Sequence, residues 1–183
     1  LPVFIPWQKP VPVTGQGSFC LYQGNLSISE NERAADWLLN EVFNDLEIPF
    51  VVAGKNPSLP LQTLAHAHTH TCIVSNPSDK ELQDLIRKAQ INIIPSFNET
   101  GVKLKLINAL FNGRFCLCNR AAIAGSRLEG LCLEANTAAE MKERIQAIFQ
   151  KPFPVETAAQ RELELTSLYN NEANARRLMT WIW

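Results

Sequence analysis

The sequence predicts an α/β domain of the doubly wound, Rossmann-like class, with a six-stranded parallel sheet and helices on both of its faces. Short apolar runs recur along the chain, and they are nearly continuous rather than alternating, as expected for strands that are covered on both faces. Stretches with helical periodicity lie between them. This succession of strand, loop and helix repeats about six times, which favours parallel strands joined by crossover helices.

Six apolar runs give the predicted strands. They are residues Phe19–Gln23, Phe50–Ala53, Thr71–Ser75, Ile91–Pro95, Phe115–Cys118 and Leu131–Glu134. We expect the first strand to lie in the interior of the sheet. Ligands of such sheets bind beyond the carboxyl ends of the strands, where the strand order reverses, so the loops that follow the strands are the places to look for function.

Several helices are predicted from apolar spacing and from a Ser or Thr followed three residues later by Glu, the pattern of a capping box. The first extends from Ser29 to Leu46 and is closed by Ile48-Pro49. The second begins at Ser78 and runs to about Ala89, and the third begins at Thr137 and runs to about Gln150. Residues 156–183 read as two further helices divided near Asn170-Asn171.

Composition limits the function classes. The chain has 183 residues, which fits one ordinary domain, and 46% apolar with 19% charged residues is a globular balance. The net charge of −1 provides no basic surface for nucleic acid or for an anionic membrane. No apolar run approaches the roughly 20 residues that a membrane helix needs. The first residues resemble no signal peptide and lack Met, so we expect a chain cut from a longer polypeptide.

Residues 1–18 contain four prolines and are expected to form an extended interdomain linker, with residues 19–183 as the folded domain. The five cysteines are odd in number and fit neither a disulfide framework nor a zinc site. They lie in short apolar runs, so we expect buried, reduced thiols and a cytoplasmic protein; they are Cys20, Cys72, Cys116, Cys118 and Cys132.

Three loops that follow predicted strands contain candidate ligand-binding residues. Gly24-Asn25 follows the first strand, Lys55 follows the second and Asn76 follows the third. None forms the G-x-G-x-x-G fingerprint, which argues against a nicotinamide or flavin enzyme. Each loop alone could equally be ordinary turn chemistry, and only their common position at strand ends gives them weight.

The segment after the fourth strand gives the strongest local signal. Thr100 is expected to cap a helix, Gly101 lets the backbone approach a ligand, and Gly113 ends the helix. Lys103 and Lys105 then fall in its first turn, where the helix dipole disfavours cations. A bound anion would reverse that effect, because amides and ammonium groups would share one phosphate. The alternative is two ordinary surface lysines.

The run Thr100–Gly113 resembles the donor-site segment of the retaining glycosyltransferases of family 4, and Phe19–Leu26 and Phe50–Gly54 resemble the first two strands of the same domain. The resemblance implies two facing Rossmann-like domains (the GT-B fold), of which this chain is the C-terminal, donor-binding one. The N-terminal acceptor domain then lies outside it. The family's second donor-site glutamate falls at Asn108, and the first falls at Thr100, beside Glu99.

The resemblance implies transfer of a sugar from a nucleotide-diphosphate sugar to a hydroxyl acceptor with retention. It implies no metal and no other cofactor. The partners are the donor and the chain's own N-terminal domain, which would supply the catalytic base and the acceptor site, so the fragment alone is expected to be inactive. Peripheral membrane association through that other half stays open. The implied donor-binding residues are Gly24, Asn25, Lys55, Asn76, Glu99, Thr100, Gly101, Lys103, Lys105 and Asn108.

Other interpretations stay open. The chain could be a non-catalytic flavodoxin-like regulatory domain or half of a sugar-nucleotide epimerase. His66, His68 and His70 would share one face of an extended segment and could bind zinc, although a solvated loop is the preferred interpretation. Trp181 and Trp183 either pack the last helix on the sheet or dock it on the other half.

Overall fold

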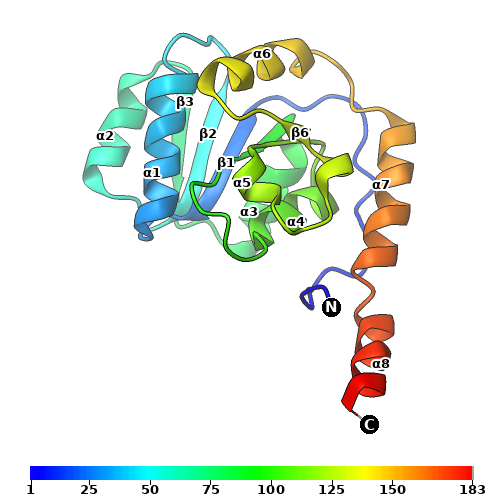
Figure 1. The fold of residues 1–183 in the computed structure, drawn as a ribbon. Helices are drawn as coiled ribbons and strands as arrows, with labels where there is room; N and C mark the ends of the chain where they lie inside the picture. Colours follow the sequence, from blue (N-terminus) through cyan, green and yellow to red (C-terminus); the bar gives the residue numbers. More distant parts are fainter. Residues whose placement is uncertain (183) are drawn as a thin grey trace.

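A six-stranded, entirely parallel sheet forms the centre of the computed structural model, which describes residues 1–182 (Figure 1). The strand order is β3-β2-β1-β4-β5-β6, so the first strand lies inside the sheet, as predicted. The strands are β1 (Cys20–Asn25), β2 (Phe50–Lys55), β3 (Thr71–Ser75), β4 (Ile91–Ile94), β5 (Phe115–Cys118) and β6 (Leu133–Glu134). The predicted fold class is therefore confirmed.

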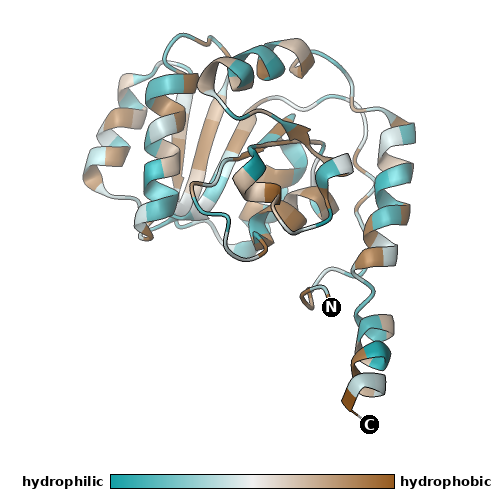
Figure 2. Cartoon of the chain, in the orientation of Figure 1, coloured by the Kyte–Doolittle hydropathy of each residue, from teal (hydrophilic) through white to brown (hydrophobic). Residues whose placement is uncertain are grey.

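Helices cover both faces of this sheet. They are α1 (Ser29–Trp37), η1 (Leu38–Val42), α2 (Leu59–Ala67), α3 (Asp79–Lys88), α4 (Leu104–Asn112), α5 (Arg120–Ile123), η2 (Glu129–Leu131), α6 (Ala138–Ile148), α7 (Val155–Leu168) and α8 (Asn171–Ile182). One core cluster joins the sheet to α1, η1, α2 and α6. A second cluster joins the sheet to α3, and a third joins it to α4, α5 and α7. Most residues of the central strands β1, β2, β4 and β5 are buried, as expected for strands covered on both faces, whereas the edge strands β3 and β6 are partly exposed. Figure 2 shows the hydropathy of the chain on the same view.

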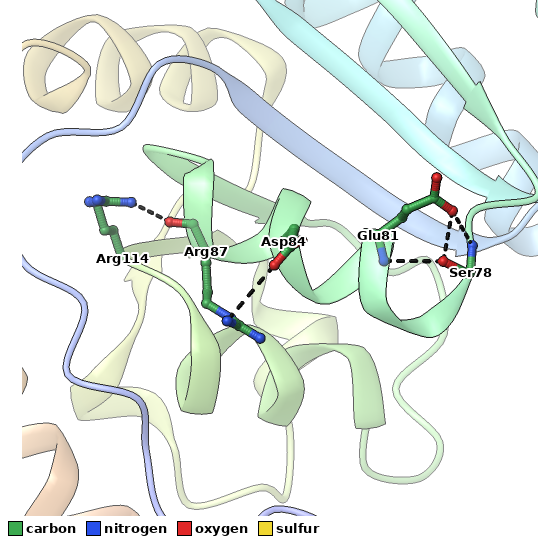
Figure 3. A network of polar contacts seen from close by, with 5 residues as sticks. All are labelled: Ser78, Glu81, Asp84, Arg87 and Arg114. Carbon is green, nitrogen blue, oxygen red and sulfur yellow. Dashed lines mark hydrogen bonds and ion pairs between the residues drawn. The ribbon is translucent and has the colours of Figure 1, made fainter.

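Of the three residues predicted to begin capping boxes, Ser78 and Thr137 cap their helices. Figure 3 shows the complete capping box of α3, in which the Ser78 amide donates to the Glu81 carboxylate (2.8 Å) and the Glu81 amide donates to the Ser78 hydroxyl (3.3 Å). Thr137 caps α6 by accepting from the Glu140 amide (3.2 Å), but the Glu140 carboxylate accepts from the Asn136 amide instead. These bonds satisfy donors that a helix start leaves free.

The capping box predicted at Ser29 is wrong. The residue that caps α1 is Ile28, which makes no side-chain cap bond, and the Glu32 carboxylate accepts from the Ser58 hydroxyl at the start of α2. The predicted helix also changes form before Leu46, since it continues as the π-helical segment η1 and ends at Val42. The Glu32 carboxylate is therefore bonded to the neighbouring helix and does not cap its own.

Helix α2 was not predicted; in it Ser58 accepts from the Leu61 amide (3.2 Å) and Pro60 occupies the first turn. His66 lies in this helix, His68 follows its end and His70 lies in the turn before β3. The three histidines therefore do not share one extended face. Among residues 1–182, no group of three or more His, Cys, Asp or Glu is placed to hold a metal ion.

The proline-rich N-terminal segment is extended, but it packs on the domain and contributes to its core. Ile5 is only 3% exposed. The Asn171 side chain binds the backbone of Ile5: it donates to the Ile5 carbonyl (2.7 Å) and accepts from the Ile5 amide (3.2 Å). Trp7 lies against Phe111, with ring centroids 6.0 Å apart, and the Val11 amide donates to the Phe111 carbonyl. A proline-rich composition did not indicate this packing.

The C-terminal helices divide where the sequence predicted, and α8 projects from the body of the domain (Figure 1). It has no buried residue, so Trp181 does not pack on the sheet, and Trp183 lies outside the described residues. None of the helices within residues 1–182 has the length and apolar character needed to span a bilayer.

The cysteines depart from expectation at two positions. Cys20, Cys116 and Cys118 are buried, whereas Cys132 is half-buried and Cys72 is exposed. Cys72 lies on β3, the edge strand, where one side of the strand has no neighbour to cover it.

Candidate functional site

A cavity of about 800 Å³ opens at the carboxyl ends of β1 and β2, between the first turns of α1, α3 and α4. It lies where the strand order reverses between β1 and β4, the position at which doubly wound sheets bind ligands. Its lining is formed by Gln23, Gly24, Asn25, Ile28, Glu30, Asn31, Ala53, Gly54, Lys55, Pro77, Asp79, Leu82, Asn98, Thr100, Val102, Lys103, Leu104 and Lys105. Six of the ten predicted donor-site residues are in this set: Gly24, Asn25, Lys55, Thr100, Lys103 and Lys105.

Glycines at the ends of β1 and β2 allow close packing rather than an open approach for a ligand. A Cβ on Gly54 would lie 1.9 Å from the Gly24 carbonyl oxygen, so β2 has no room for a side chain there. A Cβ on Gly24 would meet the Asn31 side chain at 3.2 Å. Asn31 donates to the Asn25 carbonyl (3.0 Å) and thereby fastens the start of α1 over the end of β1.

The loop between β4 and α4 forms one wall of the cavity. Asn98 organises it, because its side-chain oxygen accepts from both the amide and the hydroxyl of Thr100 (2.6 Å each). Thr100 was expected to cap α4 but does not. The residue at the cap position is Lys103, which makes no side-chain cap bond. Gly101 has a φ of +71°, a conformation that glycine adopts readily, and it lies outside the cavity lining. Gly113 follows the helix end, as predicted, in extended backbone.

Lys105 reaches from the first turn of α4 across the carboxyl edge of the sheet. Its ammonium lies 2.9 Å from Asn31 Oδ1 and 3.3 Å from the Tyr22 hydroxyl, and it lies 4.9 Å from the centroid of the Tyr22 ring. Lys103, still in the loop, donates to the Thr100 carbonyl. The two lysines therefore lie on the same cavity although they are only two residues apart, because only one of them is inside the helix.

The Lys105 ammonium is largely buried and has hydrogen bonds to neutral groups but no ion-pair partner among the described residues. Desolvation lowers the pKa of Lys105 to about 8; Glu30 opposes this shift and the nearby Lys103 adds to it. Burial also raises the pKa of the Tyr22 phenol well above its usual value, with a smaller contribution from Glu30, so Tyr22 stays a neutral hydroxyl. No carboxylate forms an ion pair with Lys105 within the described chain. An anion in the cavity would supply that missing partner.

Gln23 contributes a second unsatisfied polar group. It lines the cavity at the end of β1, is 7% exposed, and its Nε2 is buried with no hydrogen-bond partner among residues 1–182. A buried donor without an acceptor costs about 1–3 kcal/mol. A ligand oxygen beside β1 would remove that cost.

Four predicted residues are not in the lining. Asn76 accepts from the Asn56 amide (2.8 Å) and joins the loops that follow β2 and β3. Glu99 is exposed, as is Gly101. The Asn108 side-chain oxygen accepts from Asn112 within α4 (2.8 Å), and Asn108 does not line the cavity, although the resemblance implied a donor-binding role for it.

The helices α1 and α3 present to the cavity polar residues that were not predicted from the sequence, chiefly Glu30, Asn31 and Asp79. Glu30 also accepts from the Ser96 hydroxyl (3.1 Å), linking α1 to the end of β4. In the sequence these residues look like ordinary polar residues of a first helical turn, and no spacing signal distinguishes them. The combination of three lysines with carboxylates and amides suits a ligand with both anionic and hydroxyl groups.

Several solved structures with this fold are described as glycosyltransferases or as a UDP-forming synthase. The UDP-forming α,α-trehalose-phosphate synthase from Burkholderia xenovorans aligns over 85% of this chain and 40% of its own, with a TM-score of 0.59 and 16% identity. AviGT4, a glycosyltransferase involved in avilamycin A biosynthesis, aligns over 94% of this chain and 58% of its own, with a TM-score of 0.60 and 13% identity. The glycosyltransferase SnogD from Streptomyces nogalater aligns over 97% of this chain and 49% of its own, with a TM-score of 0.56 and 17% identity.

These likenesses show the fold, and the chain spans only 40–58% of the length of these three structures. No curated protein sequence matches the chain. The model of the family described as glycosyl transferases group 1 matches residues 18–151, which include every strand of the sheet and all the residues that line the cavity. The chain belongs to the group 1 glycosyltransferase family.

Proposed function

We propose that this chain is the donor-binding half of a glycosyltransferase that moves a sugar from a nucleotide-diphosphate sugar to a hydroxyl acceptor with retention. The observation that carries the proposal is the convergence of Lys55, Lys103 and Lys105 on one cavity at the switch point of the sheet. Family membership supports the class of reaction.

The diphosphate would lie at the start of α4. The first amides of a helix have no acceptors inside the helix, and the dipole makes this end positive. Lys103 and Lys105 lie at this helix start, and Lys55 at the end of β2 lines the same cavity. As the bond to the sugar breaks, negative charge grows on the leaving diphosphate, and fixed positive groups at that point stabilise the transition state.

The nucleoside and sugar would occupy the part of the cavity beside β1, where Gln23 and Asn25 offer amide groups to hydroxyls or to a base. The acceptor and the catalytic base would come from a second domain that faces this cavity. In keeping with this division, the chain covers about half or less of two of the three glycosyltransferase-like structures. The isolated chain is then expected to bind the donor weakly and to transfer no sugar.

Calorimetry with a nucleoside diphosphate and the matching nucleoside tests the proposal on the chain itself. We expect the diphosphate to bind and the nucleoside to bind at least tenfold more weakly, since each charged hydrogen bond contributes about 1.5–3 kcal/mol. Lys55→Ala should weaken diphosphate binding, whereas Lys88→Ala, an exposed lysine on α3 outside the cavity lining, should leave it unchanged.

Two results would contradict the proposal. Equal affinity for the diphosphate and the nucleoside would show that this cavity has no phosphate site. Equal effects of Lys55→Ala and Lys88→Ala on diphosphate binding would show the same. Sugar transfer at high turnover by the 183-residue chain alone would show that it needs no second half.

A further inference from the structure

Three cysteines gather at the β6 edge of the sheet, away from the cavity described above. Cys116 and Cys118 lie two residues apart on β5, so their side chains are on the same face, and Cys132 immediately precedes β6. Leu117 pairs with Leu133 and Cys118 with Glu134, which places Cys132 opposite Cys116 one step back along both strands. All three side chains contact the core cluster beneath α4 and α7.

A buried cation lies beside these thiols. Arg161 of α7 is 4% exposed and donates to the carbonyls of Gly113 (2.9 Å) and Arg114 (2.7 Å). Its Nε is buried without a partner, and no ion pair in the described part of the chain involves its guanidinium. A buried guanidinium is costly without a compensating anion. The ionisable groups whose charges act on it are Cys116 and Cys132.

Cys132 is the thiol that can provide this anion. Hydrogen bonds from the Cys116 and Cys118 thiols lower the pKa of Cys132 to about 5; Arg161 also lowers it, while burial and Glu129 oppose the shift. The same hydrogen bonds, together with burial, raise the pKa of Cys116 and of Cys118 far above their usual range. These shifts favour one thiolate, at Cys132, beside two neutral thiols, of which Cys118 also donates to the Leu133 carbonyl (3.8 Å).

We propose that Cys132 is an oxidation site whose thiolate reacts with hydroperoxides and is then captured by Cys116 as an internal disulfide. The thiolate attacks one peroxide oxygen and the O–O bond breaks, which gives the Cys132 sulfenic acid and releases hydroxide or alkoxide. The Cys116 sulfur then attacks the Cys132 sulfur, forming the S–S bond as the sulfenic oxygen leaves with two protons as water. Cysteine is oxidised and the hydroperoxide is reduced.

The register of the two strands suits this second step. Neighbouring strands of a sheet lie about 4.8 Å apart, inside the roughly 4.4–6.8 Å that separates the Cα atoms of disulfide-bonded cysteines. Cys132 is half-buried, so a small peroxide can reach it, whereas Cys116 is fully covered and is reached only by Cys132. The bond would close residues 117–131, which include α5, into a loop fastened across the β5–β6 pair.

Cys72 provides an internal control. It is more exposed than Cys132, and burial, the one cause that acts on its pKa, raises that pKa above the ordinary value. Exposure alone predicts that Cys72 reacts faster than Cys132. The thiolate site predicts the reverse at acid pH.

The first test follows alkylation of each cysteine by iodoacetamide between pH 4.5 and 9, with peptide mass spectrometry as the readout. The Cys132 rate should level off above about pH 6, with a midpoint near 5, and should exceed the Cys72 rate by at least tenfold at pH 5.5, even though a low pKa reduces nucleophilicity. A Cys132 profile that still rises at pH 8.5 would overturn the proposal.

The same profile tests Arg161. Arg161→Met should move the Cys132 midpoint upward, and Arg161→Lys, which keeps the charge, should restore it at least in part. A melting curve for each variant shows whether the fold persists. A midpoint that is unmoved in folded Arg161→Met protein would refute the part assigned to the guanidinium.

The second test treats the protein with one equivalent of hydrogen peroxide at pH 7 and maps the disulfides. We expect a Cys116–Cys132 bond in the wild type, a trapped Cys132 sulfenic acid in Cys116→Ser, and the normal bond in Cys118→Ser and Cys72→Ser. A Cys118–Cys132 bond in the wild type would overturn the assignment of Cys116, and oxidation of Cys72 before Cys132 would overturn the site.

Discussion

The lowered pKa of Lys105 predicts that binding of a nucleoside diphosphate takes up protons near pH 8. In the free chain, burial lowers this pKa from its ordinary 10.5 to about 8, so the ammonium is half deprotonated at that pH. A phosphate beside Lys105 stabilises the charged form and raises its pKa again. The bound state therefore holds more protons than the free state between the two pKa values, and affinity must fall as pH rises through 8.

The size of this effect follows from the shift. If the bound pKa returns to 10.5, the affinity at pH 9 should be about tenfold lower than at pH 7, a difference of about 1.4 kcal/mol. Binding should take up about half a proton at pH 8 and nearly one at pH 9. The diphosphate itself does not titrate in this range, because its last pKa lies near 6.

Titration calorimetry in two buffers with different ionisation enthalpies measures the proton uptake directly. Lys105→Met keeps the apolar stem and removes the charge, so it should weaken binding by about 1.5–3 kcal/mol at pH 7 and abolish the extra proton uptake. We expect it to unfold no more easily than the wild type, because it removes a desolvated cation near the positive end of α4. Equal pH dependence in wild type and Lys105→Met would refute the assignment of Lys105 to the phosphate.

Three further predictions concern the scaffold. Gly54→Ala should lower the free energy of unfolding in urea by about 2 kcal/mol or more, because its Cβ would overlap the Gly24 carbonyl at 1.9 Å; an unchanged midpoint would show that β1 and β2 separate freely. Ser78→Ala removes the capping box that it forms with Glu81 and should cost about 0.5–2 kcal/mol in the same assay, with no loss contradicting the role of the cap. Ile5→Ala should cost about 2–4 kcal/mol if residues 1–18 belong to the folded unit, whereas a mobile linker would show no change in melting temperature.

The sequence determined the class of fold because burial on both faces of a parallel sheet leaves continuous apolar runs. Such runs, as at Phe115–Cys118, are visible without any knowledge of their neighbours. Local caps were equally visible where donor and acceptor are three residues apart, as in Ser78 and Glu81. The topology also predicted that a ligand site would lie at the carboxyl ends of the strands, and six of the ten residues predicted for it line the cavity found there.

The tertiary structure alone decided which of these residues face the cavity and what their charges do. Lys105 and Asn31 are 74 residues apart in the chain, and their hydrogen bond exists only because α1 and α4 begin on either side of the sheet edge. Asn108 shares the face of Lys105 by spacing, yet it bonds to Asn112, because pairing inside a helix competes with the cavity. Register between β5 and β6 likewise brings Cys132 to Cys116, since long-range pairing depends on the path of the whole chain and not on local pattern.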